Sequence, residues 1–122
     1  VHGCANAMYL PKVIKYNAKE PEAAKRYADI ARFLHLEGKT DAELVDALIA
    51  HLRGMNKKLN IPMCIKDYEG GIIDEKEFLE KLPQVAELAV GDACTGSNPR
   101  QITPAVMEKL LDCCFYDKEV DF

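Results

Sequence analysis

Residues 40–59 read Thr-Asp-Ala-Glu-Leu-Val-Asp-Ala-Leu-Ile-Ala-His-Leu-Arg-Gly-Met-Asn-Lys-Lys-Leu, and this stretch decides the fold class. Thr40 and Glu43 form a capping box, in which each side chain can meet a backbone amide at the start of a helix. Apolar residues then recur every three or four positions, as one face of an amphipathic helix requires. That stripe consists of Val45, Leu48, Ile49, Leu52, Met55 and Leu59. Pro62 disfavours helical backbone in the residue before it, so the helix should end there.

The same periodicity extends over the rest of the chain. It marks segments at about 3–16, 21–34, 74–89 and 103–114, whereas no stretch alternates with the period of two that a strand needs. Gly70-Gly71 and residues 91–100 are rich in turn formers and are expected to be loops. The sequence therefore predicts an all-α fold, a compact bundle of five to six helices in a single domain.

Several details follow from the same pattern. The first segment is apolar almost all round until Lys12, so the start of that helix is expected to be buried. Pro11 and Pro83 should kink or divide their helices, because proline lacks the amide that a helix interior uses. One apolar face of the second helix is expected to comprise Ala24, Tyr27, Ile30, Ala31 and Leu34. The neighbouring thiols Cys113 and Cys114 should lie one in the core and one at its boundary.

Composition excludes several classes of partner. The 122 residues carry a formal net charge of -4, with 48% hydrophobic and 30% charged residues. Nucleic acids and anionic membranes both need clustered positive charge, which this chain lacks. No apolar run is long enough to span a bilayer. The five cysteines are odd in number and irregular in spacing, which favours a reducing cytoplasmic location over a disulfide framework.

Three histidines are candidates for chemistry. His2 stands at the start of the first helix, and neutral imidazole is a common metal ligand, but only Cys4 lies at short ligand spacing. His35 is expected at the end of the second helix and His51 on the solvent side of the third. From the residues alone, three interpretations of the function remain: the chain is part of an enzyme, a self-standing helical interaction module, or a small metal protein using His2 and Cys4.

Four short motifs occur in order along the chain. Residues 2–17 read His-Gly-x-x-Asn-Ala…Leu-Pro-x-Val…Tyr-Asn, and residues 27–31 read Tyr-x-x-Ile-Ala. Residues 59–62 read Leu-x-Ile-Pro, and residues 92–100 read Asp-x-Cys-Thr-x-x-Asn-Pro-Arg. Together they resemble the iron-containing (group III) alcohol dehydrogenases, and they are also similar to the alcohol dehydrogenase half of bifunctional aldehyde–alcohol dehydrogenases.

The resemblance implies an architecture and a metal ligand. Members of the family join an N-terminal nucleotide-binding α/β domain to a C-terminal all-helical domain of the dehydroquinate synthase-like type, with the active site between them. Residues 1–122 would then be the helical domain, with the nucleotide-binding domain absent from them. In the family one aspartate and three histidines hold Fe²⁺, or another divalent metal, and the resemblance assigns His2 as the last of these. Many members have proline where Val1 stands.

The resemblance also implies a reaction. It would be interconversion of alcohols and aldehydes by hydride transfer to or from NAD(P), which the absent N-terminal domain would mainly bind. Cys94 would line the alcohol pocket, while Asn98 and Arg100 would hold its loop. The isolated chain would be inactive, because one histidine holds iron poorly. The expected partners are its own nucleotide-binding domain and a small alcohol or aldehyde, in a homo-oligomeric parent enzyme.

Overall fold

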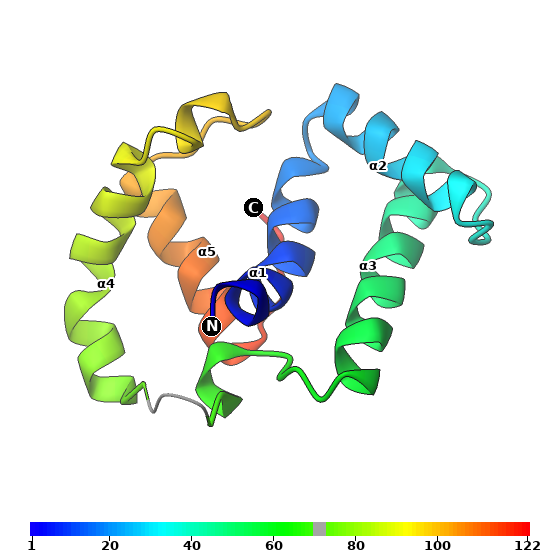
Figure 1. Ribbon diagram of the computed structural model, residues 1–122. Helices are drawn as coiled ribbons and strands as arrows, with labels where there is room; N and C mark the ends of the chain where they lie inside the picture. The colour runs from blue at the N-terminus through cyan, green and yellow to red at the C-terminus, as the bar shows by residue number, and fades with distance from the viewer. Residues whose placement is uncertain (70–72) are drawn as a thin grey trace.

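The chain folds into α-helices joined by loops (Figure 1). The structure is a computed structural model that describes residues 1–69 and 73–122, so the loop expected at Gly70-Gly71 lies outside the described residues. The described part holds five α-helices, two 3-10 turns and no strand: α1 (His2–Asn17), α2 (Pro21–Phe33), α3 (Asp41–Lys58), η1 (Ile65–Asp67), α4 (Glu75–Gly91), η2 (Thr95–Ser97) and α5 (Pro104–Tyr116). The predicted all-α bundle is confirmed.

Side chains cap the helices much as the sequence predicts. The Thr40 hydroxyl accepts a hydrogen bond from the Glu43 amide at 3.2 Å. The Glu43 carboxylate reaches back one residue further than expected and accepts from the Lys39 amide at 2.5 Å. Asp74 and Thr103 cap α4 and α5 in the same way. These bonds satisfy amides that the first helical turn leaves without partners.

Helix α1 is the centre of the molecule. In Figure 1 it lies between the pair α2 and α3 on one side and the pair α4 and α5 on the other. The principal helix contacts agree, because α2 packs on α3, α4 packs on α5, and α1 touches both α3 and α5. The two sides of α1 are therefore covered by different pairs of helices.

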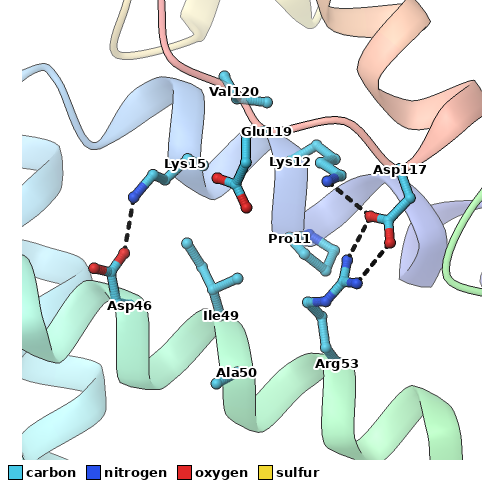
Figure 2. A pocket seen from close by; sticks show the side chains of 10 residues that line it. All are labelled: Pro11, Lys12, Lys15, Asp46, Ile49, Ala50, Arg53, Asp117, Glu119 and Val120. Atoms are coloured by element: carbon cyan, nitrogen blue, oxygen red, sulfur yellow. Dashed lines mark hydrogen bonds and ion pairs between the residues drawn. The ribbon is translucent and has the colours of Figure 1, made fainter.

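The C-terminal segment closes one side of α1 through a partly buried ionic cluster (Figure 2). Asp117 has left-handed backbone with φ 59°, which turns the chain back after α5. Its carboxylate meets both nitrogens of the Arg53 fork and the Lys12 ammonium, each at 2.8 Å. Lys12 is only 8% exposed and also donates to the Lys118 carbonyl at 2.7 Å. The cluster ties α1, α3 and the C-terminal segment together.

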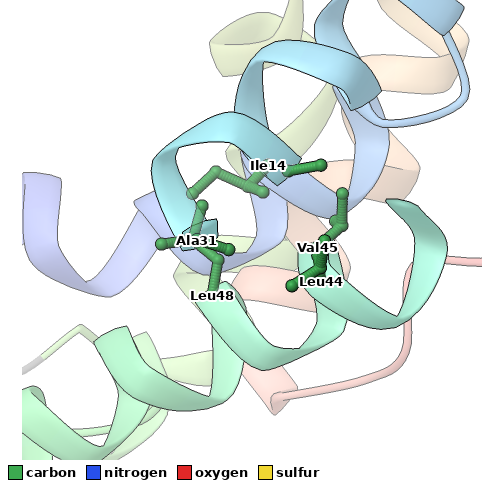
Figure 3. Packing of buried hydrophobic residues seen from close by; sticks show 6 residues of the cluster. Ile14, Ala31, Leu44, Val45 and Leu48 are labelled. Atoms are coloured by element: carbon green, nitrogen blue, oxygen red, sulfur yellow. The ribbon is translucent and has the colours of Figure 1, made fainter. Parts of the chain in front are cut away.

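Three groups of buried side chains form the core. The first joins α1, α2 and α3 (Figure 3) and consists of Ile14, Ala28, Ala31, Leu44, Val45 and Leu48. A second joins α1, α5 and the C-terminal segment through Tyr16, Leu110, Cys113 and Val120. The third consists of Ile65, Cys114 and Phe115, and Phe78 stacks on Phe115 with centroids 4.1 Å apart.

Of the two effects expected of Pro11, a kink or a division, the division does not occur, because α1 continues through Pro11 as one helix. A proline cannot donate to the carbonyl four residues before it, so the Ala7 carbonyl loses its helical partner. The side-chain amide of Asn56 in α3 replaces that partner, because its Nδ2 donates to the Ala7 carbonyl at 2.9 Å. Pro83 does not divide α4 either. Pro83 and Leu79 are both exposed, so water can reach the carbonyl that Pro83 leaves free.

Three burial predictions are wrong in whole or in part. The start of α1 is exposed, and burial begins only at Met8, near the carbonyl where α3 makes its hydrogen bond. In α2 the predicted face is only partly buried: Ala31 is buried and Tyr27 packs against the first core group, whereas Ile30 and Leu34 are 48% and 40% exposed. The buried residues of α2 are alanines, whose small side chains let the helices approach. Cys113 and Cys114 are both buried, because α5 is covered on two sides by different core groups.

Candidate functional site

One face of α1 carries a continuous stripe that begins at His2. Asn6, Tyr9, Val13 and Tyr16 follow it at spacings of four, three, four and three residues, which places all five on the same side of a helix. The side chains of α1 lean toward its N-terminus, as helical side chains do. The stripe therefore runs from the candidate metal ligand, His2, along one face of α1 to the residues that this face contacts further along the helix.

His2 is exposed in the first turn of α1 and is oriented by its neighbour one turn later. Nδ2 of Asn6 lies 3.0 Å from Nε2 of His2. An amide nitrogen can only donate, so in this arrangement Nε2 accepts; rotating the amide by half a turn would instead let its oxygen accept from Nε2. In either case Asn6 holds the imidazole ring in one orientation.

His2 can supply one of the ligands of a metal site. Imidazole is a suitable ligand for iron and other first-row metals, and the exposed position of His2 leaves it open to ligands from elsewhere. Among residues 1–69 and 73–122, no three histidine, cysteine, aspartate or glutamate side chains lie together as a metal site needs. Cys4 is half-buried and belongs to no such group. Further ligands would have to come from outside these residues.

Beyond His2 the stripe forms the wall of an apolar groove. The groove has a volume of about 640 Å³ and lies between α1, α4, α5 and the loop after α4. Its α1 wall runs from Asn6 to Asn17, a length of about 16 Å at the helical rise. The remaining walls are largely apolar and include Val85, Ala89, Ile102, Met107, Leu110 and Leu111. The groove thus begins one turn after His2 and leads away from it.

Cys94 lines this groove and is exposed. Its backbone amide donates to the Asp92 carboxylate at 2.8 Å, and the Thr95 hydroxyl donates to the Ala89 carbonyl at 2.6 Å. These bonds fix the turn that presents the thiol. The structure therefore places Cys94 in the groove, on the loop that faces α1, while His2 stands beyond the other end.

Asn98 and Arg100 attach the same loop to the end of α1. Asn98 and Asn17 exchange two side-chain hydrogen bonds, of 3.0 and 2.8 Å. Nη1 of Arg100 donates to the Tyr16 carbonyl at 2.9 Å and to the Phe122 carbonyl at 2.8 Å, and the guanidinium lies 4.0 Å from the centroid of the Tyr16 ring. This attachment holds Cys94 in place against α1.

The other histidines do not join the site. His35 is exposed in the turn after α2 with a φ of 58°, and His51 is exposed on α3. Two residues of the site had no role assigned from the sequence, although Asn6 belongs to the first motif. Asn6 and Tyr9 stand four and seven positions after His2, and that spacing alone would have placed them on the face of the metal candidate.

Comparisons with known proteins identify the family of the chain. The family model described as "Fe-containing alcohol dehydrogenase family, C-terminal" matches residues 1–115. The chain belongs to this family.

Relatives in the iron-containing alcohol dehydrogenase family are similar over nearly the whole chain. An NADPH-dependent butanol dehydrogenase of Clostridium saccharobutylicum is 50% identical over 99% of this chain and 30% of its own length. An aldehyde-alcohol dehydrogenase of Clostridium acetobutylicum is 40% identical over 91% of this chain and 14% of its own. The chain thus spans less than a third of these relatives.

A solved structure has the same fold. The crystal structure of a 1,3-propanediol oxidoreductase superposes with a TM-score of 0.80, at 26% identity, over 94% of this chain and 28% of that one. No helix among the described residues is long and apolar enough to cross a membrane.

Proposed function

We propose that residues 1–122 act as the metal-contacting helical domain of an NAD(P)-linked alcohol dehydrogenase that interconverts alcohols and aldehydes. The stripe on α1 carries this proposal, because it links a helix-terminal imidazole to an apolar groove on one helix face. Family membership supports the same chemistry.

His2 would be one ligand of a divalent metal, with iron the first candidate. When bound, such a metal acts as a Lewis acid toward the oxygen of an alcohol or a carbonyl. With its amide rotated so that Oδ1 accepts from the Nε2–H group, Asn6 would hold the imidazole with Nδ1 free for the metal, as partners of ligating histidines commonly do. The remaining ligands would come from outside the described residues.

The groove would bind the carbon chain of the substrate. Its aliphatic walls favour alkyl groups and exclude water, and its position one turn from His2 would direct the oxygen of an alcohol toward the metal end. Cys94, at the loop that faces α1, would contact the chain away from the reacting oxygen. The hydrogen bonds of Asn98 and Arg100 keep that wall rigid.

The hydride acceptor would bind elsewhere in the enzyme. The relatives are more than three times as long as the matched region, which leaves room for a nucleotide-binding domain. We therefore propose this domain as the partner of the exposed start of α1, within a cytoplasmic, homo-oligomeric enzyme that uses NAD or NADP.

The direct test compares two forms of the protein. The isolated 122-residue chain, supplied with Fe²⁺ and NAD⁺ or NADP⁺, should not oxidise 1-butanol, whereas an enzyme that joins it to a nucleotide-binding domain should. Robust turnover by the isolated chain would contradict the proposal that catalysis needs a nucleotide-binding domain in addition to residues 1–122. No turnover by the joined, metal-loaded enzyme would favour the alternative of a helical interaction module without catalysis.

A further inference from the structure

The Ala7 carbonyl is a point at which α1 is held by another helix. Pro11 leaves this carbonyl without its helical partner, and Nδ2 of Asn56 in α3 donates to it at 2.9 Å. Within residues 1–69 and 73–122, this hydrogen bond is the one between α1 and another element that lies nearest to His2 along the chain. The part of α1 that carries His2 and Asn6 therefore extends beyond its last hydrogen-bonded support.

Asn56 is itself held in place. It lies in the last turn of α3 and is only 8% exposed. Its backbone carbonyl accepts hydrogen bonds from the Leu59 amide at 3.2 Å and from the Ile61 amide at 2.8 Å, which fix the turn that follows α3. A side chain on such a restrained residue has little freedom to follow a moving partner, so Asn56 determines where the Ala7 carbonyl lies.

This support contacts α1 on the side away from the metal ligand. Cys4, Ala7 and Pro11 follow one another at spacings of three and four residues, and at about 100° per residue this row lies roughly half a turn around the helix from His2. Cys4 and Pro11 each line a cavity together with residues of α3. Helix α3 therefore supports α1 from one side and leaves the face of His2 open.

A small change at this support would displace His2. Five residues separate His2 from Ala7, which is about 7.5 Å along the helix axis. Prolines within helices commonly cause kinks, and a kink of about 20° at Ala7 would move the Cα atom of His2 by about 2.5 Å. A metal ligand must be held to within about 0.5 Å of its productive position. The direction of α1 before Pro11 thus decides whether His2 can reach a metal.

We propose that Asn56 is a positioning residue for the metal ligand, because it supplies the hydrogen bond that Pro11 cannot and so sets the direction of the first turns of α1. This inference rests on the proposed function of His2. Pro11 and Asn56 act as a pair, since the proline frees the Ala7 carbonyl and the asparagine occupies it. A residue with a backbone amide at position 11 would make the contribution of Asn56 dispensable.

The test measures the affinity of the assembled enzyme for Co²⁺ by competition with a chelator, and records the visible absorption of the bound ion, which reports the geometry of its ligands. Asn56→Leu keeps the branched shape of the side chain but cannot donate. We expect the affinity to fall about five- to tenfold, the range that loss of one hydrogen bond allows, and the spectrum to change. Pro11→Ala restores the amide at position 11, and in that background Asn56→Leu should change the affinity by less than about twofold.

The control for stability is Thr103→Ala, which removes the cap of α5 and should lower the thermal unfolding midpoint without changing the affinity for Co²⁺. An unchanged affinity in Asn56→Leu, or an equal loss with and without Pro11→Ala, would overturn the role of Asn56. Metal binding by the unaltered enzyme would in that case still support the proposed function.

Two further outcomes are also decisive. If Asn56→Leu alone does not fold, restoration of folding and of Co²⁺ affinity by added Pro11→Ala would support the proposal, and a lack of restoration would overturn it. If the unaltered enzyme bound no Co²⁺, the proposed function would fail and this inference with it.

Discussion

Arg53 and Asp117 are 64 residues apart in the chain and are joined by two parallel hydrogen bonds of 2.8 Å each. Lys12 adds a third charged contact to the same carboxylate. The segment that follows Asp117 carries Val120 into the core, and the Phe122 carbonyl accepts from Arg100. An ionic cluster on one side of α1 thus helps to hold the loop that closes the groove on the other side.

We predict that Asp117→Asn lowers the free energy of unfolding by about 2 kcal/mol, the usual value of hydrogen bonds to a charged group in a partly buried site. Asparagine tolerates the left-handed backbone of this position, so the substitution removes the charge without adding strain. Urea unfolding of the chain measures the effect. The matched control is Asp46→Asn, which breaks the more exposed Lys15–Asp46 pair and should cost less than about 1 kcal/mol. Equal losses would contradict the special role of the cluster.

The same cluster predicts a dependence of stability on pH. Hydrogen bonds from Arg53, with Lys12 contributing, lower the pKa of Asp117 from 3.8 to about 2. A carboxyl group with a lowered pKa in the folded state contributes stability above its unfolded pKa, and this stability is lost as pH falls. The stability difference between the unaltered chain and Asp117→Asn should therefore be full at pH 6 and shrink between about pH 4 and pH 2. A difference that stays constant over this range would contradict the assignment.

Thiol labelling should distinguish the exposed cysteine of the groove from the buried cysteines. Cys94 is exposed, whereas Cys64, Cys113 and Cys114 are buried. Burial also raises the pKa of each of these three thiols, to about 12 for Cys114, which disfavours the reactive thiolate. Under native conditions a maleimide should modify Cys94 first, and the three buried cysteines should react only after unfolding, as peptide mass spectrometry can show. Early modification of Cys114 would mean that the core around it opens.

Asn6→Ala tests the orientation of the metal ligand. Loss of a side chain that orients a ligating histidine typically weakens metal affinity by 10- to 100-fold. We expect a decrease of this order in the assembled enzyme, measured by competition with a chelator followed spectroscopically. Thr103 caps a different helix, and Thr103→Ala should alter stability without changing metal affinity. An unchanged affinity in Asn6→Ala would remove the positioning role.

The sequence was sufficient for the fold and for part of the site. Regular apolar spacing and capping residues located the helices, because these features act within a few residues of each other. Several of the failed predictions involve distant residues. The ability of α1 to continue through Pro11 depends on Asn56, which lies 49 positions from the Ala7 carbonyl to which it donates. The burial of Cys113 and Cys114 depends on which groups cover α5. The groove depends on the Asn17–Asn98 attachment, which no local pattern indicates.

The metal content of the assembled enzyme tests the central claim most directly. His2→Ala should lose most of the bound divalent metal per protomer, whereas His51→Ala, which removes an exposed histidine from α3, should keep it. Elemental analysis after gel filtration gives both ratios in one experiment. Full metal content in His2→Ala would contradict the assignment of His2 as a metal ligand. It would also contradict the proposal that α1 links the metal to the substrate groove.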